Sequence, residues 1–210
     1  MEHSLSKLLK SDSNAWIIIA HPDDETIFCG GTMLSYPFVS WNVICVTMQM
    51  RTVRPKEFKD AMEMYKKFGV NIESCLTLEK KDTGKRGDLL TLEDINDWKE
   101  SLKKLGLKPD LVFTHNKEGD YGHDHHKNIN LIVHALFSNV LDFAYPGDKV
   151  IKRFSSNNKL YLVSLTKEIL AKKNKIMNSC YKSQSDIWSS RLRFMMDFYF
   201  NKRMESFISD

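Results

Sequence analysis

The chain has 210 residues, of which 42 % are hydrophobic and 28 % charged, and its formal net charge is +4. This composition predicts one domain over residues 1–210 and excludes a chain that is disordered throughout. No apolar run is long enough to span a membrane, and the first residues lack the apolar core of a secretory signal, so a cytoplasmic protein is expected. Its cysteines form no C-x-x-C pair and are expected to be reduced and mostly buried: Cys29, Cys45, Cys75 and Cys180.

The positive charge is concentrated toward the C-terminus. Residues 1–148 carry 18 basic and 22 acidic side chains, whereas residues 149–204 carry 13 basic and 3 acidic ones. Such an excess could attract nucleic acid, lipid headgroups or a phosphorylated substrate. We interpret it as the solvated surface of helices, because no block of five or six basic residues stands out. A nucleic-acid partner is not expected, since neither a zinc-finger spacing nor an aromatic–basic RNA motif accompanies the charge.

Short apolar runs alternate with amphipathic segments along the chain. The predicted elements are, in chain order, strands at Ala15–Ala20 and Asn42–Met48, a helix over 58–68, a strand at Ser74–Leu78, a helix over 92–105, a strand at Pro109–His115, a helix over 129–140, a strand at Lys159–Leu165, and helices at about Thr166–Asn178 and Gln184–Arg203. The last two form a basic helical portion over about 166–204. This alternation predicts an α/β fold with a mainly parallel sheet flanked by helices and a ligand site at the carboxyl ends of its strands.

Two clusters of acidic and imidazole side chains follow predicted strands directly. The first is His21-Pro22-Asp23-Asp24-Glu25, and the second lies within Glu118–His126. Because the carboxyl ends of parallel strands meet at one edge of the sheet, the two loops can converge. His123 and His126 are three residues apart, which one helical turn brings to the same face.

These residue types suit a catalytic zinc site, which needs three His, Asp or Glu ligands and a position left for water. His21, Asp24 and one histidine of the second loop supply the ligands. Asp23 can then take a proton from the activated water, and a second imidazole can donate to the developing oxyanion or the leaving group. The remaining histidines have no partners at ligand spacing and are expected to be surface or structural side chains: His3, His115 and His134.

At these residues the sequence resembles the PIG-L/LmbE-like zinc de-N-acetylases, which include the deacetylases of N-acetylglucosaminyl-phosphatidylinositol and of the mycothiol and bacillithiol precursors. The family's signatures A-H-P-D-D-E with a Gly pair, R-x-x-E-x-x-x-A, G-D-x-x-H-x-D-H and Y-x-S-Q appear in order as Ala20–Glu25 with Gly30-Gly31, Arg54–Ala61, Gly119–His126 and Tyr181–Gln184. The match extends over about residues 15–185.

The resemblance implies a Rossmann-like fold and one zinc ion per chain, bound by His21, Asp24 and His126. It implies that Asp23 is the general base and that His123 polarises the amide carbonyl or acts as an acid. Arg54 is implied to reach the substrate or the product acetate. The implied substrate is a 2-acetamido sugar, phosphorylated or nucleotide-linked if the basic segment attracts such a group. An N/O site of this kind also binds other divalent metals.

The chain departs from the family pattern in two places. His125 stands where the family has an Asp that orients the second-loop imidazole, so either Asp124 or His125 is a candidate to support His123. The family's T-x-G-E after the second strand is replaced by Thr47–Met50, which alters the wall of the predicted pocket.

Three functions are open on the sequence alone. A metal-dependent deacetylase of acetamido sugars is the leading hypothesis. An amidase acting on another small N-acyl compound keeps the same metal site, since the residues alone indicate only amide hydrolysis. A protein that binds an anionic ligand through its basic C-terminal segment is the third. The sequence leaves open whether the chain forms a homo-oligomer.

Overall fold

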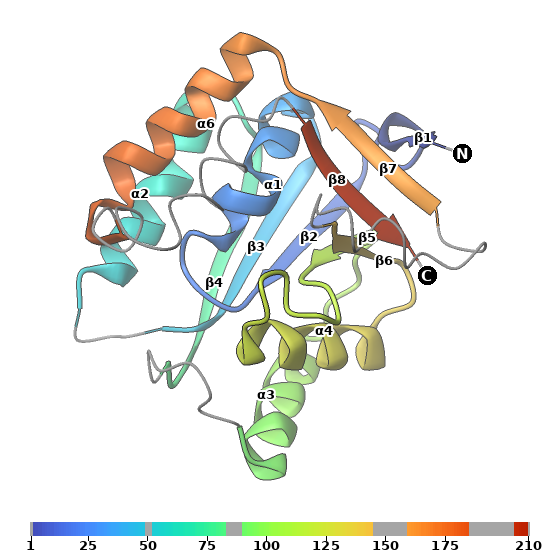
Figure 1. The fold of residues 1–210 in the computed structure, drawn as a ribbon, viewed down its shortest axis with the longest axis vertical. Coiled ribbons are helices and arrows are strands. Elements are labelled where there is room, and N and C mark those ends of the chain that lie inside the picture. Colours follow the sequence, from blue (N-terminus) through green and yellow to red (C-terminus); the bar gives the residue numbers. More distant parts are fainter. Residues whose placement is uncertain (1, 49–51, 83–89, 145–158, 185–203, 210) are drawn as a thin grey trace.

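A central sheet organises the computed structural model, which describes residues 2–48, 52–82, 90–144, 159–184 and 204–209 (Figure 1). Within these residues it has eight strands in the order β1-β7-β8-β6-β5-β2-β3-β4. Their bounds are β1 Glu2–Ser4, β2 Asn14–Ile19, β3 Ser40–Thr47, β4 Ile72–Lys80, β5 Leu111–Thr114, β6 Val140–Phe143, β7 Lys159–Ser164 and β8 Met204–Ser209. Only β8 runs antiparallel to its described neighbours, β6 and β7. The predicted mainly parallel α/β fold is therefore confirmed.

Helices cover both faces of the sheet, because successive residues of its central strands point to opposite sides. On one side Ile17 and Val43 join a core with α1 (Asp24–Ser35), α2 (Arg54–Lys67) and α6 (Lys167–Cys180). On the other side Ile18 and Ile44 pack with α3 (Leu92–Lys104) and α4 (Asp124–Leu136). Figure 1 shows these two groups of helices separated by the sheet. The chain also makes two short 3₁₀ turns, η1 (Leu5–Lys7) and η2 (Lys182–Gln184).

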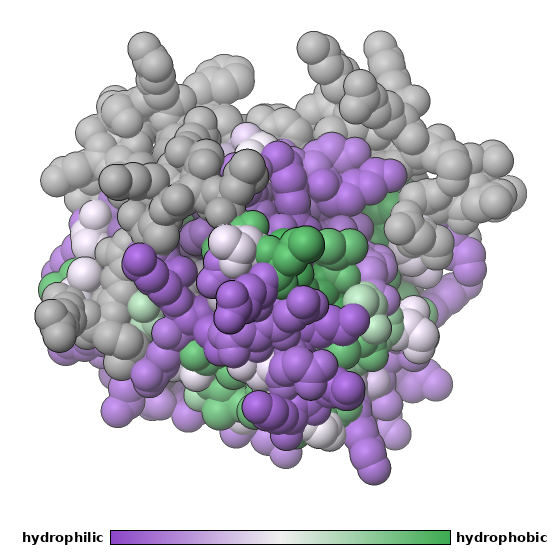
Figure 2. All heavy atoms as spheres, turned by 90° about the horizontal axis from the view of Figure 1, so that it is seen from below, coloured by the Kyte–Doolittle hydropathy of each residue, from purple (hydrophilic) through white to green (hydrophobic). Residues whose placement is uncertain are grey.

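The surface is mainly hydrophilic at the end of the molecule that carries α3, with smaller apolar areas between the polar side chains (Figure 2). Thr91 caps α3, and its side chain accepts a hydrogen bond from the Asp94 amide. Among the described helices none is long and apolar enough to cross a bilayer. The cysteines are free thiols, of which Cys75 is exposed and the other three are buried.

The sequence-based predictions were correct for all five proposed strands, which are β2, β3, β4, β5 and β7. Three short strands were missed. The apolar stripe expected to run on to Val140 ends earlier, since α4 stops at Leu136 and Val140 begins β6. In the predicted basic helical portion, α6 is confirmed, residues 185–203 lie outside the described part, and Met204 begins a strand rather than ending a helix.

A buried ion pair fastens β8 to the helices. Glu205 accepts hydrogen bonds from the backbone amides of Gly31 and Thr32, each at 2.7 Å, in the middle of α1. The Lys173 ammonium on α6 donates to Glu205 at 2.6 Å and to the Ile27 carbonyl at 2.8 Å. A Cβ at Gly31 would lie 2.9 Å from Glu205 Oε1 and 2.5 Å from a Leu165 methyl, so this close approach requires a glycine.

Candidate metal-binding active site

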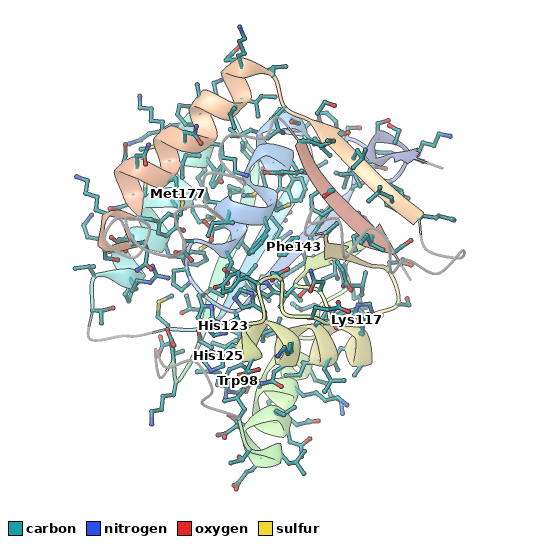
Figure 3. All side chains as sticks on the ribbon, viewed as in Figure 1. Trp98, Lys117, His123, His125, Phe143 and Met177 are labelled. Atoms are coloured by element: carbon teal, nitrogen blue, oxygen red, sulfur yellow. The ribbon has the colours of Figure 1, made fainter. Side chains whose placement is uncertain are left out.

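The two acid/His loops meet at the carboxyl ends of β2 and β5, as predicted. These strands are parallel neighbours, with Ile18 paired to Thr114, so the residues that follow each strand emerge side by side. The first loop leads into α1 and the second into α4. Figure 3 shows His123 and His125 at the start of α4, with Trp98 of α3 beside them.

Three donor atoms from the two loops form a nearly equilateral triangle. His21 Nδ1 lies 3.2 Å from His126 Nε2 and 3.4 Å from Asp24 Oδ2. Asp24 Oδ2 and His126 Nε2 are also 3.4 Å apart. All three side chains are buried. The structure thus brings together the three residues that the resemblance implies as metal ligands.

Asp24 is held as a carboxylate by its surroundings. Its Oδ2 accepts a hydrogen bond from the His21 amide at 2.8 Å, and Asp24 occupies the first turn of α1, where the helix dipole favours negative charge. Although burial alone would raise it, the neighbouring His126 and His115 hold the pKa of Asp24 well below its usual value. An anionic oxygen therefore stands 3.4 Å from a ring nitrogen of each of three histidines, His21, His126 and His115.

Asp120 orients two histidines from beneath the site. Its Oδ2 accepts from Nδ1 of His126 at 2.7 Å and from Nδ1 of His115 at 2.6 Å. The Nδ1 proton of His126 is thus fixed on Asp120, and Nε2 faces the triangle, where a metal can replace its proton. His115 Nε2 accepts from the Ala20 amide at 2.9 Å, so its lone pair is already used.

His115 is a structural side chain, as expected, but it lies at the site rather than apart from it. It is fully buried and links the ends of β2 and β5, and its hydrogen bonds leave no lone pair for a metal. His134 is structural, as expected, and contacts Asp142 at 2.8 Å. The side chain of His3 lies outside the described part of the chain.

His123 is the N-cap of α4, so it precedes the helix rather than sharing a helical turn with His126. Its Nδ1 accepts from the His125 amide at 3.2 Å, which leaves the proton of the neutral ring on Nε2. The ring is half-buried and stands edge-on to His21, with the ring centroids 4.6 Å apart. His123 can therefore present an N–H donor at the site.

Neither expected partner supports His123 through its side chain. Asp124 forms a surface ion pair with Lys127 at 2.9 Å. The His125 ring turns to the other loop, where its Nδ1 lies 3.1 Å from His21 Nε2. The His125 side chain therefore contacts His21 of the first loop.

Asp23 borders the triangle in a strained backbone conformation. It is the N-cap of α1 with φ 101°, a region that non-glycine residues rarely adopt. Arg54 Nη1 lies 3.4 Å from Asp23 Oδ2, and the same guanidinium donates to the Pro22 carbonyl. Burial raises the pKa of Asp23 to about 7, although the charge of Arg54 opposes the increase.

The motif at Tyr181–Gln184 forms hydrogen bonds with the first acid/His loop and with α2. The Tyr181 hydroxyl donates to Glu25 Oε1 at 2.6 Å. The Ser183 amide and hydroxyl donate to the Glu57 carboxylate at 2.7 and 2.6 Å. Residues of family motifs that lie far apart in the sequence are therefore hydrogen-bonded to one another. The order of the motifs along the chain did not predict these contacts.

The chain is thus an α/β protein whose acid/His loops follow two adjacent parallel strands. The chain belongs to the PIG-L family: the family model described as GlcNAc-PI de-N-acetylase matches residues 16–137. Uncharacterized protein L374 of Acanthamoeba polyphaga mimivirus is 25 % identical over 190 residues, which cover 79 % of this chain and 74 % of that protein.

Solved structures show the same fold. The A40926 pseudoaglycone deacetylase Dbv21 has a TM-score of 0.67 at 14 % identity, with 94 % of this chain and 97 % of that chain covered. N,N'-diacetylchitobiose deacetylase from Pyrococcus horikoshii has a TM-score of 0.60 at 21 % identity, with 98 % and 89 % covered.

Proposed function

We propose that this protein is a metal-dependent N-deacetylase that removes the acetyl group from a 2-acetamido sugar or a sugar conjugate. The observation that carries the proposal is the buried triangle of His21, Asp24 and His126. Family membership supports the reaction, and the deacetylases with the same fold support an acetamido sugar as the substrate class.

The residues present fit a zinc ion. In tetrahedral coordination, ligand atoms about 2.1 Å from zinc lie about 3.4 Å from one another. The three donor atoms here are 3.2–3.4 Å apart. Two imidazoles and one carboxylate form a common catalytic donor set, and Asp120 behind His126 supplies the usual carboxylate support. We therefore assign one zinc ion per chain to His21, Asp24 and His126, a site that other divalent metals can also occupy.

The bound metal supplies Lewis acidity, which polarises the amide carbonyl and lowers the pKa of water. Asp23 accepts the proton that water loses as its oxygen bonds to the carbonyl carbon. His123 donates a hydrogen bond from Nε2 to the oxyanion that develops. The C–N bond then breaks as the amine nitrogen takes up the proton that Asp23 holds, and acetate and the amino sugar leave.

Arg54 has two parts in this mechanism. It holds the Pro22 carbonyl and the Asp23 carboxylate at the start of α1. A guanidinium beside the base is also placed to meet the carboxylate of the acetate product, since Arg recognises carboxylates well.

The proposal is tested by measuring acetate release by the zinc-loaded protein. The panel contains N-acetylglucosamine, its 1-phosphate, a nucleotide-linked N-acetylglucosamine and N-acetyl amino acids. We expect release from the acetamido sugars, loss of activity with a chelator and recovery with Zn²⁺. Release from the amino acids alone would show an amidase instead. A protein that binds no divalent metal, or that releases no acetate, would overturn the proposal.

Asp120→Asn is expected to weaken zinc affinity by about 10- to 100-fold, because Asp120 fixes the tautomer of His126. Zinc affinity is measured by competition with a chromophoric chelator. Asp142→Asn provides the matched control, since Asp142 also accepts a hydrogen bond from a histidine, His134, but away from the triangle. Equal zinc affinities for the two variants would contradict the role of Asp120.

A further inference from the structure

The two ring nitrogens of His21 face different partners. Nδ1 points to Asp24 and His126, whereas Nε2 lies 3.1 Å from His125 Nδ1. Both histidines are buried, with His125 only 2 % exposed. His21 therefore connects the donor triangle to an imidazole that is not part of it.

The donor triangle determines which ring nitrogens of His21 and His125 carry protons. With a metal in the triangle, the Nε2 of His126 offers its lone pair, since the remaining ring proton is on Nδ1 and bonded to Asp120. If His21 Nδ1 also serves as a donor to a metal, the proton of His21 must be on Nε2. That N–H then points at His125 Nδ1, which accepts it, and the proton of His125 is on its own Nε2.

His125 is held in place for this contact. It lies in the first turn of α4, and its backbone amide is bonded to His123. The Trp98 ring of α3 packs edge-on against it, with the centroids 5.5 Å apart (Figure 3). Its Nε2 is buried without a hydrogen-bond partner among the described residues. The contact with His21 is thus the ring's one side-chain hydrogen bond in the described part of the chain.

We propose that His125 is a positioning residue for His21: its Nδ1 accepts the Nε2 proton of His21 and so keeps the Nδ1 lone pair of that ring directed at the metal. The inference rests on the proposed function, because it assigns the support of one of the ligands. A neutral imidazole accepts this proton more weakly than a carboxylate would, so the site holds its metal less tightly than an Asp at the same position would allow.

A matched set of variants tests the proposal. His125→Asn keeps an acceptor oxygen near the position of Nδ1, whereas the Gln side chain in His125→Gln extends it to about the position of Nε2, away from His21. We expect His125→Asn to bind zinc within about threefold of the unchanged protein and His125→Gln to bind it about 10- to 100-fold more weakly. His125→Asp is expected to bind it more tightly. Asp124→Asn, at the adjacent position, is expected to leave affinity unchanged.

Zinc affinity is measured by chelator competition and stoichiometry by metal analysis, with thermal unfolding of each apo variant to establish that it folds. Equal affinities for the Asn and Gln variants at similar stability would overturn the proposal. Donor atoms of His21, Asp82 and His125 also lie within 4.8 Å of one another, so these residues could instead form a second metal site. Two zinc ions per chain, one of which is lost in both Asp82→Asn and His125→Gln, would show that second site and would also overturn the proposal. A protein that binds no zinc would instead overturn the proposed function, and this inference with it.

Discussion

Replacing Asp23 with asparagine is expected to lower kcat for acetate release by roughly 10²- to 10⁴-fold, the usual contribution of a positioned general base. Zinc affinity should change little, because the Asp23 carboxylate is not part of the donor triangle. Asparagine is the appropriate substitution, since it tolerates a positive φ better than alanine does and Asp23 has φ 101°. Steady-state kinetics and chelator competition on the same preparation measure both quantities.

Asp97→Asn is the matched control for this experiment. Asp97 is an exposed carboxylate on α3 that pairs with Lys80, and its loss should leave kcat unchanged. Normal turnover in Asp23→Asn would remove Asp23 from the role of base. A parallel loss of zinc would show instead that the substitution disturbs the metal ligands.

Glu205→Gln is expected to lower the free energy of unfolding by about 3–5 kcal/mol, because it removes the carboxylate that pairs with the buried ammonium of Lys173. Both carboxylate oxygens of Glu205 accept hydrogen bonds from α1. The Gln side chain replaces one of them by an NH₂ donor, so one of these hydrogen bonds is lost as well. Lys173→Met should cost less, since the carboxylate then keeps its three donors in Gly31 and Thr32. Equilibrium urea denaturation followed by circular dichroism measures these differences.

The control for this comparison is Glu63→Gln on α2. Its pair with Lys66 is exposed, with both side chains about half accessible, and such pairs contribute little to stability. If Glu205→Gln were no more destabilising than Glu63→Gln, the buried pair would not be what fastens β8 to α1 and α6.

The position of the site could be predicted from the sequence because it depends on two local patterns. Each acid/His cluster directly follows an apolar run, and parallel strands place such loops at one edge. The role of His115 could not be predicted in this way. Its partner Ala20 directly follows the neighbouring strand β2, so the contact depends on the register of β2 and β5.

The contacts of the second-loop histidines could not be predicted from the sequence either. Spacing suggested that His123 and His126 share a helical turn, but α4 begins after His123. The left-handed backbone of Asp120, with φ 61°, turns its carboxylate beneath His115 and His126. Strand β8 was missed for a different reason: it carries a buried Glu205, and a charged residue at a core position hides the strand pattern.

Strand β8 also determines how the two ends of the described chain depend on each other during folding. Ile208 pairs with Asp142 of β6 on one side and with Leu160 of β7 on the other, and β7 in turn pairs with β1. Within the described residues, β1 and β7 join the rest of the sheet only through β8. These are contacts between segments far apart in the chain, which form slowly because a long loop must close first. Among the described residues, the hydrogen-bonded ladder from residues 2–4 to the central strands therefore passes through residues 204–209, so we expect pairing of the C-terminal strand to stabilise the N-terminal one.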